Sequence, residues 1–381
     1  MAGDIGEMKR SLASEAAAKR TFHTLDGLRG VAAILVVATH YASYLTPIRV
    51  GSGNLAVDLF FIMSGFVLAH AYDIRLQGGM GAGRFMLVRL IRLYPLYLLG
   101  TLIAAVIPVL GIVLGVSEQW SWASLLVALA PALLMLPRPP VLLTGAELNV
   151  RLPNALYPMN PPAWSLFFEL VINLVFATTI RIRHRSFLPL VIGISGIALV
   201  AVSLLHGSAN VGWRWEELLM AMARIGFSFF VGVLFHRACI GGWLPRLRCP
   251  PLLALACAAV LVCLKVPKEW RAFYDLACIL IALPLVTWLC ICNEPRRGVR
   301  IYSVLGLISY PLYITHESYH YPVDRIFYHF ATGRAESFAP WLAIALIVAF
   351  VGISWMLAAT YDGWARRRLG TLLGQQIARV P

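Results

Sequence analysis

Residues Leu25 to Tyr41 read LDGLRGVAAILVVATHY, an apolar stretch with an arginine near its start and a histidine near its end. An α-helix rises about 1.5 Å per residue, so Arg29 and His40 are separated by roughly 16 Å along the helix axis. Ionisable groups inside membrane helices are costly and therefore usually line a site or a pathway. We expect a cation near one membrane face and a titratable base near the middle of the bilayer.

The whole chain of 381 residues has the composition of a polytopic membrane protein. Its hydrophobic fraction is 60% and its charged fraction is 13%, whereas soluble domains are about half apolar and a quarter charged. The net charge of +14 does not indicate nucleic-acid binding, because the basic residues stand at the ends of apolar runs, where they act as orientation signals. The seven cysteines show no metal-ligand spacing, so we expect no metal site.

Apolar runs of span length give the expected architecture. They cover about 28–46, 54–73, 94–116, 120–137, 163–180, 187–206, 216–236, 250–267, 273–292, 301–320 and 338–360. Four basic clusters fall on the cytoplasmic side, where the positive-inside rule expects them, only if one run does not cross; they are Arg181, Arg183 and Arg185; Arg237, Arg246 and Arg248; Arg296, Arg297 and Arg300; and Arg366, Arg367 and Arg368. The 120–137 run is short, contains Pro131 and begins with tryptophans, so it is the predicted exception. The sequence therefore predicts an all-α polytopic helix bundle with about ten crossings, one re-entrant or interfacial segment and both termini cytoplasmic.

This topology divides the chain into three parts. Residues 1–24 are expected to form a disordered cytoplasmic tail, residues 25–361 the membrane domain, and residues 362–381 a basic cytoplasmic tail. The polar loop 138–163 is expected to cap the outer face.

Four titratable side chains fall at similar depths in four predicted spans. Helical rise places them in the middle-to-outer zone of a hydrocarbon core about 30 Å thick; they are His40, Asp58, Glu169 and His316. Similar depth suggests one shared polar cavity. Two alternatives stay open: a histidine in a span can be a packing residue, and Asp58 can be an N-terminal helix charge that faces the interface.

A second polar cluster is expected at the inner face, in RFMLVRLIRLYPLY (Arg84 to Tyr97). Arg89 and Arg92 are three positions apart and share a helix face. Guanidinium forks suit phosphates. These arginines are therefore either ligands for a phosphate-bearing molecule or simple inside-positive anchors.

Five segments together resemble the acyltransferase-3 family of integral membrane acyltransferases, over about Thr24 to Tyr361. In chain order they are LDGLRGVAAILVVATHY with Arg29 and His40; VDLFFIMSGFVL with Asp58, Phe60, Phe61, Ser64 and Gly65; RLIRLYPLY with Arg89, Arg92 and Pro95; WSLFFEL with Trp164, Ser165 and Glu169; and SYPLYITH with Ser309, Tyr310, Pro311, Leu312, Tyr313 and His316.

The resemblance implies transfer of an acyl group, in particular acetyl, from cytosolic acyl-CoA to a hydroxyl of a sugar or glycan, in a bacterial cytoplasmic (inner) membrane. It implies O-acetylation of the kind that modifies polysaccharides. Acyl-CoA is then a co-substrate rather than a bound cofactor. The expected partners are acyl-CoA, a carbohydrate or glycoside acceptor and membrane lipid, with no nucleic acid.

Acyl transfer to an alcohol needs a base for the hydroxyl proton and stabilisation of the developing oxyanion. The predicted catalytic residues are His40 as the base, with Asp58 or Glu169 to orient it or the sugar. The predicted donor-binding residues are Arg29, Arg84, Arg89 and Arg92; for Arg29, pairing with a carboxylate near the inner end is the alternative. The predicted acceptor-site residues are Trp164, Ser165, Tyr313 and His316.

Other functions would leave different marks in the sequence. A transporter or flippase also explains buried ionisable groups, but it predicts paired repeats and broken helices, and the chain shows no internal repeat. A non-catalytic scaffold would need neither His40 nor Glu169. Direct transfer is the default mechanism, and an acyl-enzyme intermediate on histidine or serine is the alternative that the sequence leaves open.

Overall fold

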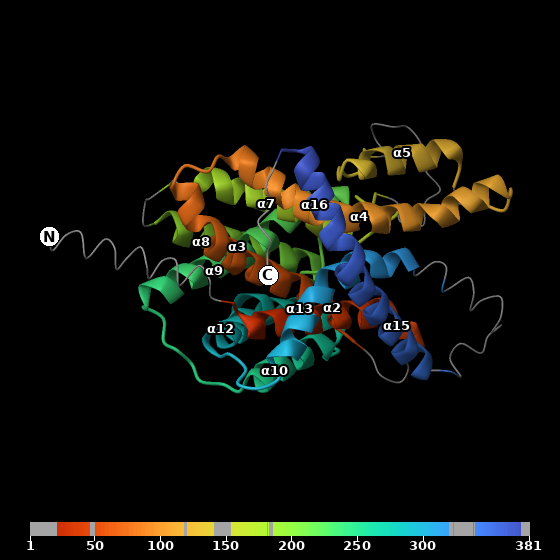
Figure 1. Cartoon of the computed structure of the whole chain (residues 1–381). Helices are drawn as coiled ribbons and strands as arrows, with labels where there is room; N and C mark the ends of the chain where they lie inside the picture. The colour runs from red at the N-terminus through yellow and green to blue at the C-terminus, as the bar shows by residue number, and fades with distance from the viewer. Residues whose placement is uncertain are drawn as a thin grey trace.

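The computed structural model describes residues 21–45, 50–117, 120–140, 154–180, 182, 186–319, 323, 338 and 340–374. Within these residues the regular elements are all helical, which confirms the predicted all-α class (Figure 1). The α-helices are α2 (His23–His40), α3 (Leu55–Gln77), α4 (Ala82–Val113), α5 (Trp122–Leu133), α7 (Ala163–Thr179), α8 (Phe187–His206), α9 (Leu218–Gly241), α10 (Pro251–Cys263), α11 (Arg271–Ala277), α12 (Leu283–Cys292), α13 (Val299–Thr315), α15 (Trp341–Leu357) and α16 (Gly363–Leu372). The 3-10 turns are η1 (Ala42–Leu45), η2 (Trp215–Glu217), η3 (Lys268–Trp270) and η5 (His316–Tyr319), and two π-helical turns are η4 (Cys278–Ala282) and η7 (Ala358–Asp362).

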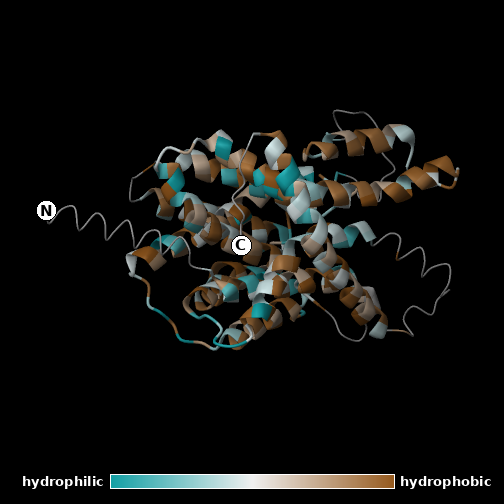
Figure 2. Ribbon diagram, viewed as in Figure 1, coloured by the Kyte–Doolittle hydropathy of each residue, from teal (hydrophilic) through white to brown (hydrophobic). Residues whose placement is uncertain are grey.

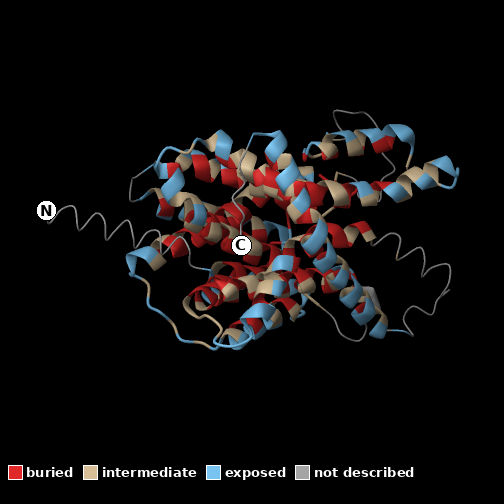
Figure 3. Ribbon diagram, in the orientation of Figure 1, coloured by how far each residue is buried: buried red, intermediate tan, exposed pale blue. Residues whose placement is uncertain are grey.

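Six helical segments of the described chain are long and apolar enough to cross a membrane. They are Leu55–Gln77, Ala82–Val113, Phe187–His206, Trp215–Gly241, Lys268–Cys292 and Trp341–Leu372. Large apolar side chains such as Leu205, Leu219 and Trp341 are exposed, and apolar segments lie at the outside of the bundle (Figures 2 and 3). Such a surface is expected where lipid, rather than water, is the solvent. The fold is that of an integral membrane protein.

Helix α5 lies within the 120–137 run, which we predict does not cross the membrane. It has 12 residues, which rise only about 18 Å, less than the hydrocarbon core of about 30 Å. The count of ten crossings and the side of each terminus stay predictions.

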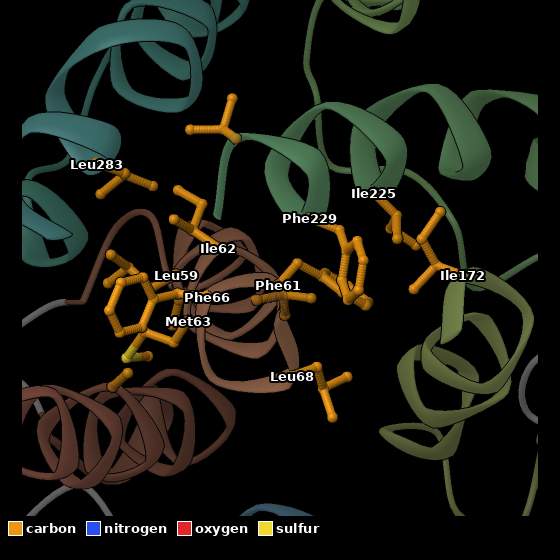
Figure 4. Packing of buried hydrophobic residues seen from close by; sticks show 14 of the residues in the cluster. Leu59, Phe61, Ile62, Met63, Phe66, Leu68, Ile172, Ile225, Phe229 and Leu283 are labelled. Atoms are coloured by element: carbon orange, nitrogen blue, oxygen red, sulfur yellow. The ribbon is translucent and has the colours of Figure 1, made fainter. Parts of the chain in front are cut away.

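The core is built around a close crossing of α3 and α9. A Cβ atom added at Gly65 would lie 1.9 Å from the carbonyl oxygen of Phe229, and one at Gly232 would lie 2.0 Å from that of Ile62. Small residues are what allow two membrane helices to bring their backbones together. Phe66 and other large side chains then fill the space on both sides of the crossing (Figure 4).

Helices α2 and α13 also lie side by side, again because glycines allow it. A Cβ atom at Gly27 would lie 2.4 Å from the ring of Tyr302, and one at Gly30 would lie 2.4 Å from the Cβ atom of Leu305. Both helices therefore end at the same level, with His40 as the last residue of α2 and His316 directly after α13.

The ends of the chain bear on the predicted domain division. Helix α16 follows α15 through the π-helical turn η7 and packs against α4 (Figure 1). Residues 363–372 of the predicted C-terminal tail are thus helical. The N-terminal residues 1–20 and the centre of the predicted cap, residues 141–153, lie outside the described residues.

Candidate active site

Two histidines meet where α2 and α13 end. The ring centroids of His40 and His316 are 4.9 Å apart, and His316 Nε2 lies 3.3 Å from His40 Nδ1. His40 Nδ1 is also 2.9 Å from the carbonyl oxygen of Val36, and His316 Nδ1 is 2.8 Å from that of Tyr313. A carbonyl oxygen can only accept, so each Nδ1 carries the proton. Each Nε2 then presents a lone pair, as a base or a metal ligand requires.

A carboxylate stands next to this pair. Glu317 Oε2 lies 3.9 Å from His40 Nε2 and 4.0 Å from His316 Nε2. His40 is exposed, whereas His316 is fully enclosed. The C-terminal end of α2 therefore offers one accessible imidazole, backed by a second imidazole and a negative charge.

The same three side chains could hold a metal ion. One ligand atom from each of His40, His316 and Glu317 lies within 4.8 Å of the others. Two imidazoles and a carboxylate are a set of ligands that zinc accepts. The expectation of no metal site, made from cysteine spacing, therefore needs a direct metal measurement.

The predicted acceptor-site residues are linked through Tyr313. Its hydroxyl lies 2.8 Å from Ser165 Oγ, and its ring centroid lies 6.2 Å from that of His316. Ser165 Oγ donates to the carbonyl oxygen of Pro162 at 2.9 Å, so the serine accepts from Tyr313. Trp164 packs differently: its ring contacts Phe168 at 6.0 Å between centroids. Tyr313 and His316 thus lie together, Ser165 is joined to them through Tyr313, and Trp164 belongs to the packing of its own helix.

Asp58, a predicted catalytic residue, has a different partner from the one expected. Arg224 of α9 donates from Nε to Asp58 Oδ1 and Oδ2 at 3.0 and 3.2 Å, and from Nη2 to Oδ2 at 2.6 Å. Ser228 Oγ donates to Oδ1 at 3.2 Å. Both charged side chains are almost completely buried, with exposed fractions of 0% and 1%. This pair ties α3 to α9 next to their glycine crossing.

Glu169 and Arg89, predicted for two different roles, form one ion pair. Arg89 Nη2 donates to Glu169 Oε1 at 2.5 Å, and Ser64 Oγ donates to the same oxygen at 3.3 Å. The carboxylate therefore neutralises one arginine of α4. Of the four groups expected to share one cavity, only His40 and His316 touch; Asp58 and Glu169 each hold an arginine instead.

Two further arginines lie in the interior with no such partner. Among the residues that the structure describes, Arg29 and Arg92 have no hydrogen bond or ion pair, although each is at least half-buried. They act electrostatically on each other and on Arg89 and Arg366, and the Asp26 carboxylate acts on both of them. Arg84 is exposed near the start of α4. The guanidinium groups of Arg29, Arg89, Arg92 and Arg366 outnumber the carboxylates of Asp26, Glu169 and Asp362 around them, so this enclosed cluster favours a bound anion.

A known family accounts for this combination of residues. The sequence model of a family described as an acyltransferase domain matches residues 22–359. The chain belongs to the acyltransferase-3 family. It is 37% identical over 190 residues to "Protein 2 in picA locus" of Rhizobium radiobacter, and the aligned region covers 48% of this chain and 94% of that protein. It is 30% identical over 177 residues to "Acyltransferase MdmB" of Streptomyces mycarofaciens, and the aligned region covers 42% of this chain and 40% of that protein.

No solved structure matches the chain. The predicted family membership is confirmed, and the chain is accordingly a membrane acyltransferase.

Three charged residues of this acyltransferase were missed in the sequence. Glu317 directly follows the predicted His316, and Arg224 lies inside an apolar run, where any ionisable residue signals a function or a partner. Arg366 is the first of three consecutive arginines, and this run already has an explanation as an orientation signal. The sequence therefore gives no sign that Arg366 itself lies near the arginines of α2 and α4.

Proposed function

We propose that the protein transfers an acyl group, in the simplest case acetyl, from cytosolic acyl-CoA to a hydroxyl of a sugar or glycan acceptor, with His40 as the general base. One observation carries this proposal. A single helix, α2, has an accessible imidazole with a free Nε2 at one end and Arg29, a member of the arginine cluster, toward the other. A base and an anion site are the two things that acyl transfer from a phosphate-bearing donor requires.

The proposed chemistry starts at His40 Nε2. This atom takes the proton of the acceptor hydroxyl while the hydroxyl oxygen attacks the thioester carbonyl. The carbon–sulfur bond then breaks, and the departing thiolate receives that proton from the imidazolium. Glu317, 3.9 Å from Nε2, stabilises the positive charge on the ring. It takes the place that we expected for Asp58 or Glu169, because those carboxylates hold Arg224 and Arg89.

The donor would bind through its phosphates at the arginine cluster. Arg29 and Arg92 form no direct ion pair among the described residues, and Arg89 stands beside them. The exposed Arg84 would attract the donor at the entrance. In this arrangement the thioester arm extends along α2 toward His40, and acyl-CoA is used as a substrate rather than kept as a cofactor.

The acceptor would bind at the outer end of the site. Tyr313 and His316 would shape the end of the site that receives the sugar, with Ser165 and Trp164 behind them. Direct transfer is the mechanism that we propose, since the Ser165 hydroxyl already donates to the carbonyl oxygen of Pro162 and has no hydrogen bond to a histidine among the described residues. The same proposal places the protein in the bacterial inner membrane, with ten crossings and both termini in the cytoplasm. Family membership does not favour a transporter or flippase.

The decisive experiment compares His40→Ala with His206→Ala, a control that removes an exposed histidine at the end of α8. Cells that produce each variant are analysed by mass spectrometry for acylated surface glycans and secreted glycosides, and each purified protein is tested for CoA binding. We expect His40→Ala to lose the acyl mass shift while it binds CoA normally, and His206→Ala to match the wild type. Normal acylation by His40→Ala would refute the base assignment.

The metal content of the purified protein decides whether His40 is a general base or a metal ligand. The purified wild type is assayed for zinc and other transition metals before and after chelation. We expect no stoichiometric metal and no loss of activity on chelation. A metal bound in a 1:1 ratio that His40→Ala loses would make His40 a ligand, and a metal-bound water the base.

A further inference from the structure

The last described helix, α16, begins directly after a π-helical turn, Ala358–Asp362. Single π turns are rare and are often found at functional sites. Asp362 closes this turn and is only 8% exposed. Arg366, one helical turn later, donates from Nε to Asp362 Oδ1 at 2.7 Å and from Nη2 to Oδ2.

This pair faces the arginine cluster of α2 and α4. Helix α16 packs against α4 (Figure 1), and the hydroxyl of Tyr361 donates to the carbonyl oxygen of Pro95 at 3.3 Å. Arg366 acts electrostatically on both Arg29 and Arg92, and Asp362 acts on Arg92. The next two arginines, Arg367 and Arg368, are exposed.

The balance of charge in this cluster is unusual for a protein interior. Guanidinium groups from three helices come together; they are Arg29, Arg89, Arg92 and Arg366. Glu169 neutralises Arg89, Asp362 neutralises Arg366, and Asp26 acts electrostatically on Arg29 and Arg92. Like charges held together out of water repel each other unless an anion is supplied. Four guanidinium groups thus face three carboxylates, which leaves positive charge in excess for an anion, and Arg366 stands at the edge of this cluster.

We propose that Arg366 is a phosphate ligand of the acyl-CoA site, and that Asp362 occupies its guanidinium group as long as no donor is bound. The C-terminal helix thus forms one wall of the donor site, an inference that rests on the proposed function. On binding, a phosphate replaces the Asp362 carboxylate at the guanidinium fork, which accepts phosphate and carboxylate in the same bidentate geometry.

The test uses the purified full-length protein and three probes: CoA, 3′-dephospho-CoA and pantetheine, which carries no phosphate. Binding is measured by calorimetry, so no acceptor is needed. Charge-assisted hydrogen bonds are strong enough that we expect Arg366→Ala to raise the Kd of CoA about tenfold or more. Arg368→Ala, which removes an exposed arginine of the same helix, should bind CoA like the wild type. Pantetheine binding should be equal in all variants, and 3′-dephospho-CoA shows which phosphate Arg366 contacts.

Asp362→Asn tests the exchange itself. It removes the competing charge and keeps the side-chain shape, so the Kd of CoA should fall several-fold. If Arg366→Ala does not fold, Arg366→Gln replaces it, with thermal melting as the folding control. A wild-type Kd for CoA in the Arg366 variant, or equal effects of the Arg366 and Arg368 variants, would overturn this inference alone. A wild type that binds no CoA would overturn the proposed function, and this inference with it.

Discussion

The role of Asp58 can be decided by removing it. The carboxylate accepts three N–H contacts from Arg224 and one hydroxyl contact from Ser228, with both charged groups excluded from solvent. Asp58→Ala leaves Arg224 with only the carbonyl oxygens of Val211 and Asn54. Removal of one partner from a buried ion pair costs about 3–5 kcal/mol. We expect the free energy of unfolding to fall by about that amount.

The assay is equilibrium unfolding in mixed micelles, followed by circular dichroism, with acyl transfer measured on the folded fraction. Asp73→Ala is the matched control on the same helix, since Asp73 Oδ1 accepts a hydrogen bond at 3.1 Å from the exposed side chain of Gln77; surface changes of this kind stay within about 0.5 kcal/mol. The double variant Asp58→Leu with Arg224→Met should regain most of the lost stability, because apolar replacement of a buried pair is often neutral. An Asp58→Ala protein that is as stable as the wild type but inactive would refute the structural role and restore the catalytic one.

Three further predictions follow from the site and the packing. Glu317→Gln keeps the shape next to His40 but removes the charge that stabilises the imidazolium, so kcat should fall about 10-fold or more with an unchanged Kd for CoA; an unchanged kcat would exclude this role. Gly65→Leu should prevent folding, because even a Cβ atom would lie 1.9 Å from the Phe229 carbonyl oxygen, whereas Gly352→Leu, which meets nothing within 4 Å, should fold and serves as the control. Single cysteines placed in residues 138–163 of a cysteine-free protein should react with impermeant reagents from outside; protection there would refute the ten-crossing topology.

The sequence predicts the helices well because length and hydrophobicity decide where a membrane helix lies. The run expected at 187–206 is the helix Phe187–His206, and the run at 163–180 is the helix Ala163–Thr179. The run expected to begin at residue 94 is instead the end of one helix, Ala82–Val113, that passes through Pro95. Proline is tolerated there because neighbouring groups in a membrane bundle can satisfy the freed backbone carbonyls.

The pairing of polar groups could not be predicted in the same way. Helical rise gives the depth of a residue, but the direction of its side chain around the helix axis depends on which neighbour packs there. Asp58 points to α9 because Gly65 and Gly232 bring these two helices together, and so it meets Arg224. His40 and His316, which the sequence predicts at similar depth, are neighbours because the glycines of α2 and α13 bring these two helices together.

The rigidity of α2 has a consequence for the choice of substrate. Arg29 and His40 lie eleven positions apart on one unbroken helix, a fixed span of roughly 16 Å. If Arg29 and His40 act on one donor molecule, the helix sets the distance that this molecule must span. A thioester whose phosphate and carbonyl are separated by much less than this distance can reach Arg29 or His40, but not both. Selection for donor length would then be built into the backbone of the first helix rather than into any single side chain.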